Sequence, residues 1–390
     1  MSNSFSRILF IAKRECRRLI ANPVYVLGMV VFPILVTVLF TSLMDEGQPE
    51  EMPVGVVDLD NTSFTRKLTR SLDAFQTTHI VARYPNVEEA RKAMQQGTIY
   101  AFLYYPKGTT DALLSSRQPT ISFYYSYTSL TAGSLLFRDL KTISTLGSAA
   151  VGSATLKAKG LTDAQIGTFL QPIKIDLHTV ANPWVNYNVY LSTMLVPGCL
   201  LLFVFLITAY AFGMELKQNT SRQLIKIAGG KCWIAIAGKA LPHLLVHLAI
   251  FSLYLLYIYK VLHFPHEGGG GVIALLAVLS VMGSMGFAIF MFGLFPSLRM
   301  SMSMCSLWGV LSYSMVGTAF PTFAMDAPLE VLSNLFPLRH YFRIYQTCVF
   351  NGNALIYDWA NILALVVFAL LPLLVARSIR KAYSTYVYLP

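Results

Sequence analysis

The chain contains apolar runs long enough to cross a membrane, and these runs limit its fold more than any other feature. The clearest run covers residues 191–213 and is interrupted only by Pro197 and Thr208. A helix needs about 20 apolar residues to cross ~30 Å of hydrocarbon. Counting the span that contains this run, six apolar segments lie at residues 24–44, 190–213, 233–259, 272–295, 302–320 and 354–376. They predict an α-helical polytopic membrane protein with six transmembrane helices.

The distribution of charge orients these helices and excludes a nucleic-acid partner. The chain of 390 residues is 55% hydrophobic and 13% charged, with a formal net charge of +11. The positive excess lies near the N-terminus, in residues 214–231 and after residue 376, which are the segments that a spanning protein keeps in the cytoplasm. Residues 45–188 are neutral, with 13 Lys/Arg and 13 Asp/Glu. Aromatic residues do not alternate with basic ones along a groove, so we expect no nucleic-acid binding.

The segment 45–188 predicts an extracytoplasmic α/β (α+β) domain inserted between the first and second helices. One span separates it from the basic N-terminus, so it lies on the opposite side of the membrane. Short β-rich runs alternate with helical segments in the order β-α-β-α-β, which is typical of a small layered domain. The strands are expected at 54–58, 78–83, 99–105, 120–125 and 173–177, and the helices at 64–75, 86–96 and, as one or two helices, 129–159. Two helices begin at capping-box patterns, Asn86–Glu89 and Thr162–Gln165. The segment has no cysteine, which excludes a disulfide framework there.

A short basic loop, residues 214–232, joins the second and third spans. It carries Lys217, Arg222, Lys226 and Lys231, and this density of positive charge marks the cytoplasmic side. The order Glu215, Thr220, Leu224 predicts a short helix at the membrane face. An ordinary positive-inside loop is the simpler interpretation of the same residues.

The first 23 residues predict a basic amphipathic helix in the cytoplasmic membrane interface. Apolar residues gather on one side, and five Lys/Arg between Arg7 and Arg18 cover much of the rest. Such a helix is suited to anionic lipid, although it could also be a plain lead-in to the first span.

These features together resemble the membrane (permease) subunits of type 2 family ABC exporters, in the subgroup with a large outer domain. The resemblance rests on Arg14-Glu15 with Asn22-Pro23, on Val56-Val57-Asp58 and Glu88-Glu89-Ala90, and on the run from Glu215 through Thr220 to Leu224. Asn219 stands where the family usually has glycine, and Gln223 stands near the usual acidic position. The resemblance implies separate cytoplasmic ATPase subunits, which would hold the ATP and Mg, while this chain binds no cofactor. It implies an ATPase-coupling role for Glu215, Lys217, Thr220, Gln223, Leu224, Arg14 and Glu15.

Residues 321–350 are too polar to span a membrane and are rich in proline. The family resemblance implies a pair of short helices that re-enter the outer leaflet at the pore mouth, and a plain outer loop is the alternative. Irregular backbone at that depth must be packed in protein or face water. The expected outer-gate residues are Phe320, Pro321, Pro328, Pro337, Arg339 and Tyr341.

The sequence contains no complete motif for nucleotide binding, catalysis or metal binding. The nucleotide-binding pattern G-x-x-x-x-G-K-[ST] is absent, so we expect no catalytic residue and energy from a partner. Lys239, His243 and His247 form one stripe on the third span, because they are four residues apart. We expect structural or cavity-lining contacts rather than a metal site, since no third ligand is evident. Lys239 is near enough to the inner surface to extend its ammonium group to it.

The sequence therefore predicts a permease subunit of an ATP-driven exporter in a bacterial cytoplasmic membrane. It would dimerise with itself or a sister permease, contact membrane lipid, meet a periplasmic adaptor in some assemblies, and move a hydrophobic or amphipathic substrate outward. The principal alternative is a membrane-anchored receptor or assembly scaffold whose 45–188 domain binds a ligand. An ion-coupled transporter is disfavoured, because no span centre carries a carboxylate.

Overall fold

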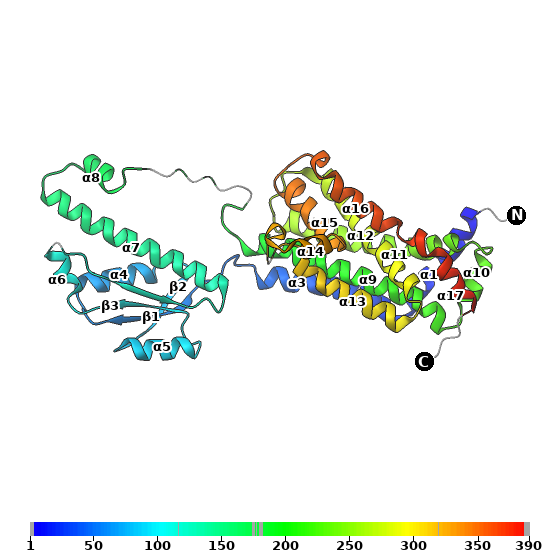
Figure 1. Cartoon of the computed structure of the whole chain (residues 1–390), viewed down its shortest axis with the longest axis horizontal. Coiled ribbons are helices and arrows are strands. Elements are labelled where there is room, and N and C mark those ends of the chain that lie inside the picture. The colour runs from blue at the N-terminus through cyan, green and yellow to red at the C-terminus, as the bar shows by residue number, and fades with distance from the viewer. Residues whose placement is uncertain are drawn as a thin grey trace. The chain divides into compact units, whose positions relative to one another are not determined.

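The contacts within the chain divide it into a helical unit and an α/β unit, which are described separately. The computed structural model describes residues 4–115, 117–173, 176, 178, 182–318 and 320–385. The helical unit comprises residues 1–45 and 179–390, and the α/β unit comprises residues 46–178 (Figure 1).

The α/β unit is built on a four-stranded sheet of order β2-β1-β3-β4. Strand β1 (Met52–Asp58) is parallel to β2 (Thr78–Arg83) and to β3 (Ala101–Tyr105), whereas β4 (Ser122–Tyr125) is antiparallel to β3. β1 is buried along most of its length, as a central parallel strand covered on both faces must be. The strands predicted in these four places are present. The strand predicted at 173–177 falls mostly outside the described residues.

The helices of this unit are, in chain order, α4 (Ser63–Asp73), α5 (Val87–Gln95), α6 (Thr109–Leu114), α7 (Leu130–Ala158) and α8 (Asp163–Leu170). α4 and α7 cover one face of the sheet and α5 covers the other, whereas α8 packs on α7 (Figure 1). The apolar residues of α7 pack with one face of the sheet, and those of α5 pack with the other.

Local sequence signals set the helix ends in this unit. α8 begins at a full capping box, in which the Thr162 and Gln165 side chains each bond the other's backbone N–H. α5 begins at Asn86, whose side chain accepts from the Glu89 N–H. The segment 129–159 proves to be one long helix, and α6 is a short helix that the sequence did not predict.

The helical unit contains twelve α-helices in its described residues. They are α1 (Ser4–Ala21), α2 (Pro23–Val26), α3 (Phe32–Leu43), α9 (Thr193–Lys217), α10 (Ser221–Ile227), α11 (Cys232–Leu256), α12 (Gly269–Leu294), α13 (Leu298–Met315), α14 (Ala327–Ser333), α15 (Pro337–Ile344), α16 (Trp359–Leu370) and α17 (Pro372–Thr385). Four π-helical segments adjoin these helices in the described residues, at Leu27–Val31, Asn188–Ser192, Tyr257–Val261 and Tyr345–Phe350.

Five helical segments of the described chain are long and apolar enough to cross a membrane. They are Pro23–Leu43, Asn188–Lys217, Cys232–Val261, Gly269–Leu294 and Leu355–Thr385. The span predicted at 302–320 corresponds to α13, which begins at Leu298 and ends at Met315. α13 is less apolar than the five because it includes Arg299 and several serines.

The described C-terminal residues are helical. Residues 377–390 were expected to form a cytoplasmic tail, which stays a prediction, and α17 continues through them as far as Thr385. The prediction missed an amphipathic helix, in which Ile379 and Tyr383 are buried while the basic residues face outward. Residues 386–390 lie outside the described part of the chain.

Glycines allow the central helices to approach closely. A Cβ added to Gly286 on α12 would lie 2.2 Å from the Phe368 carbonyl oxygen of α16. A Cβ on Gly293 would lie 2.4 Å from Val375 on α17. Membrane helices use small residues in this way, because dispersion contacts between close backbones hold them together.

Candidate functional site: a buried ion network behind the 214–232 loop

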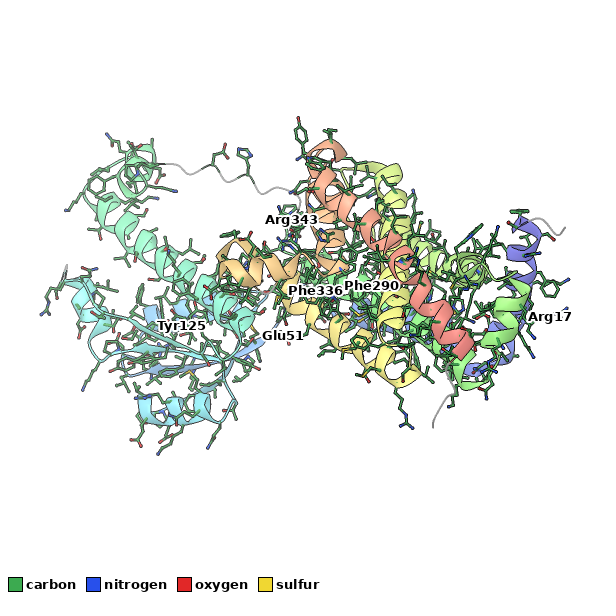
Figure 2. The ribbon with its side chains drawn as sticks, turned by 45° about the vertical axis from the view of Figure 1, so that its right-hand side comes forward. Arg17, Glu51, Tyr125, Phe290, Phe336 and Arg343 are labelled. Atoms are coloured by element: carbon green, nitrogen blue, oxygen red, sulfur yellow. The ribbon has the colours of Figure 1, made fainter. Side chains whose placement is uncertain are left out.

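The network begins on α1, whose buried face carries an acid. Ile11, Ala12, Glu15 and Leu19 are the buried residues of this helix, and α1 packs on α11. The approach is close at Gly238, where a Cβ would lie 2.9 Å from the Ile8 carbonyl oxygen. Basic residues occupy the other faces, and Arg17, labelled in Figure 2, is exposed.

Glu15 is paired with two side chains of α11. The Lys239 ammonium donates to its Oε1 at 2.6 Å, and His243 Nε2 lies 3.1 Å from the same oxygen. Burial raises the pKa of the Glu15 carboxyl, but the Lys239 charge and the His243 hydrogen bond outweigh burial and lower the pKa to about 2. Glu15 is therefore a buried carboxylate that stays ionised.

A second buried carboxylate, Glu215, lies in the last turn of α9. Arg14 donates to both of its oxygens, at 3.0 and 3.1 Å, and Arg18 donates to Oε1. This two-point contact fixes the guanidinium geometry as well as the charge. Lys239 also reaches Glu215. The positive charges of Arg14, Arg18 and Lys239 therefore complement the negative end of the α9 helix dipole as well.

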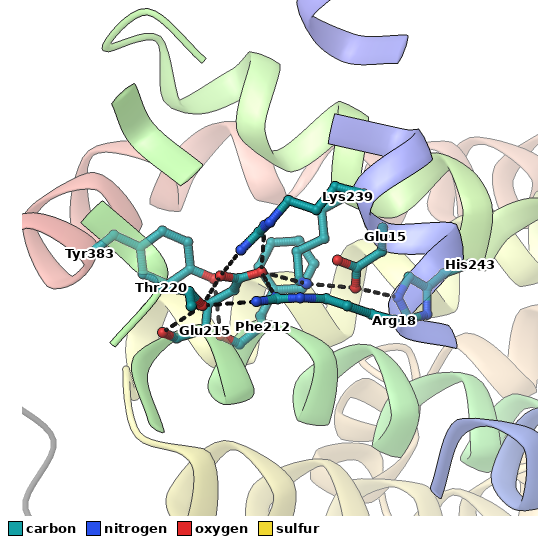
Figure 3. A network of polar contacts seen from close by, with 9 residues as sticks. Glu15, Arg18, Phe212, Glu215, Thr220, Lys239, His243 and Tyr383 are labelled. Carbon is teal, nitrogen blue, oxygen red and sulfur yellow. Dashed lines mark hydrogen bonds and ion pairs between the residues drawn. The ribbon is translucent and has the colours of Figure 1, made fainter. Parts of the chain in front are cut away.

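Lys239 joins the two carboxylates. Its Nζ lies 2.6 Å from Glu15 and 3.1 Å from Glu215, and the residue has no exposed surface. The expectation that Lys239 extends to the membrane surface is therefore wrong, because two acids on other helices hold it inside. Figure 3 shows this arrangement, with the ammonium group between the carboxylates of α1 and α9.

The two histidines of the predicted stripe are both buried. His243 reaches Glu15, but its Nδ1 has no hydrogen-bond partner in the described residues, and neither does His247 Nε2. No three His, Cys, Asp or Glu side chains of the described chain gather as they would around a metal ion. A cavity-lining role for the stripe stays a prediction.

The network continues into the 214–232 loop. The Thr220 hydroxyl donates to Glu215 Oε2 at 2.5 Å and accepts from Arg18 at 3.1 Å. Asn219 has φ +56°, a left-handed conformation that glycine or asparagine adopts most easily. This conformation explains how Asn219 can stand where the family usually has glycine.

The helix of the loop, α10, is tied to α17. The Ser221 hydroxyl donates to the Tyr383 carbonyl oxygen, and the Tyr383 hydroxyl donates to the Phe212 carbonyl oxygen, both at 3.0 Å. Leu224 is fully buried and packs in the same apolar cluster as Ile11 and Tyr383. The loop is therefore held to α1, α9 and α17 at once.

Burial divides the predicted coupling residues into two groups. Glu15, Glu215 and Leu224 have no exposed surface, and Arg14 and Thr220 are half-buried. Lys217 and Gln223 are exposed. Of the predicted coupling residues, only these two present a fully exposed side chain to a partner subunit. The exposed loop surface also includes Arg222 and Lys226.

Arg18, Ser221 and Tyr383 take part in these contacts but were not among the predicted site residues. Arg18 follows Arg14 by four positions, so both lie on one face of α1, and that spacing was the available signal. Tyr383 gave no signal, because its contacts depend on how α17 packs.

The predicted gate residues are divided in a similar way. Phe320, Pro321 and Pro328 are exposed, whereas Pro337, Arg339 and Tyr341 are buried. Arg339 donates to the Glu330 carbonyl oxygen at 2.9 Å and to the Ser333 hydroxyl, which ties α15 to α14. Trp308 stacks on Phe336 at a centroid distance of 4.8 Å and holds the same segment to α13. A pair of short helices is present, and Figure 2 labels Phe336 between them.

These features define a multi-pass helical membrane protein with a buried charge network. The family described as ABC-2 family transporter protein matches residues 24–377, and the chain belongs to this family. No curated protein matches it. Membership confirms the predicted type 2 ABC relationship and a role as a membrane component of transport, and it implies ABC ATPase partners in general.

The Glu15 ion pairs predict a loss of stability in acid. The folded pKa of about 2 is below the ordinary value of 4.5, so the stabilisation is fully present above pH ~4.5 and is lost as pH falls towards 2. A shift of this size corresponds to about 3 kcal/mol. Thermal unfolding in detergent between pH 7 and 3 should therefore show a steeper decline for the natural protein than for Glu15→Gln. Parallel curves would contradict the assignment.

Proposed function

We propose that the chain is the permease subunit of an ABC exporter in a bacterial cytoplasmic membrane. Two permeases, either identical or sister chains, would form the path, and separate ATPase subunits would drive it. α13 would complete a set of six spanning helices. The termini and the 214–232 loop would lie in the cytoplasm, and the α/β unit would lie outside.

The observation that carries this proposal is the division of the 214–232 loop into an exposed basic surface and a buried anchor. The exposed side chains of Lys217, Arg222, Gln223 and Lys226 are free to meet an ATPase. Behind them, Glu215 is ion-paired to α1 and α11. A push on the loop would therefore move α1 and α11 with it rather than deform the loop alone.

The mechanism follows from these ties. Closure of the ATPase on ATP would displace α10, and Ser221 and Thr220 would pass the displacement to α17, α9 and α1. Rotation of the bundle would open a path at the dimer interface towards residues 321–350. Glu215 would act through the network rather than by touching the ATPase, because it has no exposed surface.

The composition of several helices supports the proposed substrate class. α3, α12 and α16 contain no charged residue, and the charges of α9 are confined to Glu215 and Lys217 in its last turn. Moving a charged substrate group without a partner along a path lined by such helices would cost free energy. A hydrophobic or amphipathic substrate fits it best.

Phe320 and the segment 321–350 would form the outer gate in this proposal. The exposed Phe320, Pro321 and Pro328 would line the mouth, and the buried Arg339 would hold α14 and α15 at a fixed angle. Irregular backbone is tolerated at membrane depth where protein or water satisfies its hydrogen-bonding groups. Arg339 bonds the Glu330 carbonyl oxygen, and His340 bonds the Asn334 carbonyl oxygen.

A pull-down from the native host tests the proposal. The tagged chain is purified in mild detergent, its partners are identified by mass spectrometry, and ATP hydrolysis is measured. Co-purification of an ABC ATPase with hydrolysis is the expected result, and the same experiment shows whether a sister permease is present. An intact protein that repeatedly brings no ATPase would favour a receptor or scaffold instead.

A further inference from the structure

The α/β unit contains a cavity of about 700 Å³ that the transport proposal does not use. It lies between α4 and α7, on the sheet face that both helices cover, and Leu103, Tyr105 and Phe123 of the sheet reach it. Cavities of about 300–1,000 Å³ are typical of small-molecule sites. All of its lining residues belong to this one unit.

The cavity exists because α7 is much longer than the sheet beneath it. The helix has 29 residues, which extend about 44 Å, whereas the five residues of β3 extend about 17 Å. Leu136, Leu140 and Ile143 pack in the core of the unit, and Gly147 is the last buried residue of the helix. The same stripe continues to Val151, which has no strand to cover it and lines the cavity.

Small residues form the α7 side of the cavity. Ser144, Gly147, Ser148 and Gly152 all line the cavity, and glycine in a helix costs about 1 kcal/mol relative to alanine. Gly147 is needed for the close approach of α4, since an added Cβ would lie 2.9 Å from Leu68 Cδ2. The two serines contribute only short side chains where longer ones would fill the volume.

The lining sets the chemistry of the ligand. None of the lining residues is charged, so a charged group inside would have no partner. Phe64, Leu113 and Ile121 are only half-buried, so a ligand could remove more of their apolar surface from water. The polar side chains are the hydroxyl and amide groups of Tyr105, Gln118, Thr120, Ser144 and Ser148. The Tyr105 hydroxyl is buried and has no hydrogen-bond partner in the described residues, whereas the other four side chains are exposed.

We propose that this cavity binds an uncharged, mainly apolar molecule that carries a hydroxyl or amide-sized polar group, with a long-chain alcohol as its simplest representative. The apolar body lies against the sheet and α4, and the polar group meets the serine, threonine and glutamine side chains. This binding goes beyond the transport role, because it assigns a ligand to the α/β unit whether or not that ligand is the cargo.

Photolabelling of the full-length protein in nanodiscs tests the proposal. The probe is a hexadecanol that carries a diazirine in its chain, and labelled peptides are mapped by mass spectrometry with and without excess unlabelled hexadecanol. We expect labelling between residues 103 and 152 that the unlabelled alcohol reduces at least fivefold. Labelling of the spanning helices by probe dissolved in lipid provides an internal measure of intact protein.

Cavity-filling variants make the test specific. Ser148→Phe and, independently, Ser144→Leu should reduce the competed labelling at least fivefold, while Ala149→Leu, at an exposed position of α7 that does not line the cavity, should leave it unchanged. Absence of competed labelling in residues 103–152, or equal labelling in both filling variants, would overturn the proposal. Extraction of the purified natural protein then distinguishes the sources: enrichment, relative to Ser148→Phe, of an uncharged lipid or of an uncharged non-lipid compound supports the site and names its occupant, whereas enrichment of a charged phospholipid would contradict the proposed ligand chemistry.

Discussion

Replacing Lys239 with methionine should destabilise the protein by about 3–5 kcal/mol, the usual cost of removing one partner from a buried ion pair. Lys239 is the only fully buried lysine or arginine in the network, and its ammonium group touches both Glu15 and Glu215. Methionine fills the space but leaves Glu15 without a lysine. Thermal unfolding of the purified protein in detergent measures the effect.

A second substitution distinguishes ion pairing from packing. Glu15→Gln removes the charge that Lys239→Met leaves unpaired, so the double variant should be more stable than Lys239→Met alone. Coupling energies between contacting residues are about 0.5–3 kcal/mol. Lys231→Met, at an exposed position just before α11, is the matched control and should change stability by less than about 0.5 kcal/mol. Additive losses in the double variant would show that the pair does not interact.

Replacing Glu215 with glutamine should lower ATP hydrolysis by the complex without releasing the ATPase. The side chain keeps its size but loses the charge that attracts Arg14, Arg18 and Lys239. Hydrogen bonds to charged groups contribute about 1.5–3 kcal/mol each, and 1.4 kcal/mol is a factor of ten. We therefore expect hydrolysis by the purified complex to fall about tenfold while the ATPase still co-purifies.

A substitution on the exposed surface of the loop should have the opposite effect on the complex: the ATPase should be lost while the stability of the permease is kept. Arg222→Glu reverses a charge on an exposed side chain, so it should leave thermal stability unchanged and remove the ATPase from the purified complex. Glu215→Arg would place a fourth cation among three and should lose both stability and hydrolysis. If Glu215→Arg preserves both, the buried network has no part in coupling.

The sequence alone predicted helices and strands correctly where the signal was local in the chain. Runs of about 20 apolar residues located the five described helices that are long and apolar enough to cross a membrane, and the capping residues Asn86 and Thr162 located the starts of α5 and α8. The apolar and β-rich runs of the α/β unit gave its strand order along the chain, although not the order β2-β1-β3-β4 in the sheet.

The ion network was beyond reach because its members are far apart in the chain. Glu15 and Lys239 are 224 positions apart, and Arg14 and Glu215 are 201 positions apart. The four-residue spacing placed Lys239 and His243 on one face of α11 correctly, but no periodicity names the acid that they meet on α1. The cavity in the α/β unit depends likewise on where α7 passes the end of the sheet, which a helix pattern does not contain.

Site-specific cross-linking to the ATPase tests the central claim most directly. Benzoylphenylalanine replaces Gln223, on the exposed surface of the loop, or Gln96, an exposed residue of the α/β unit, and the complex is irradiated with its partners present. The account predicts a cross-link from position 223 to an ABC ATPase and none from position 96. A cross-link from position 96, or none from position 223 while the ATPase remains bound, would contradict it.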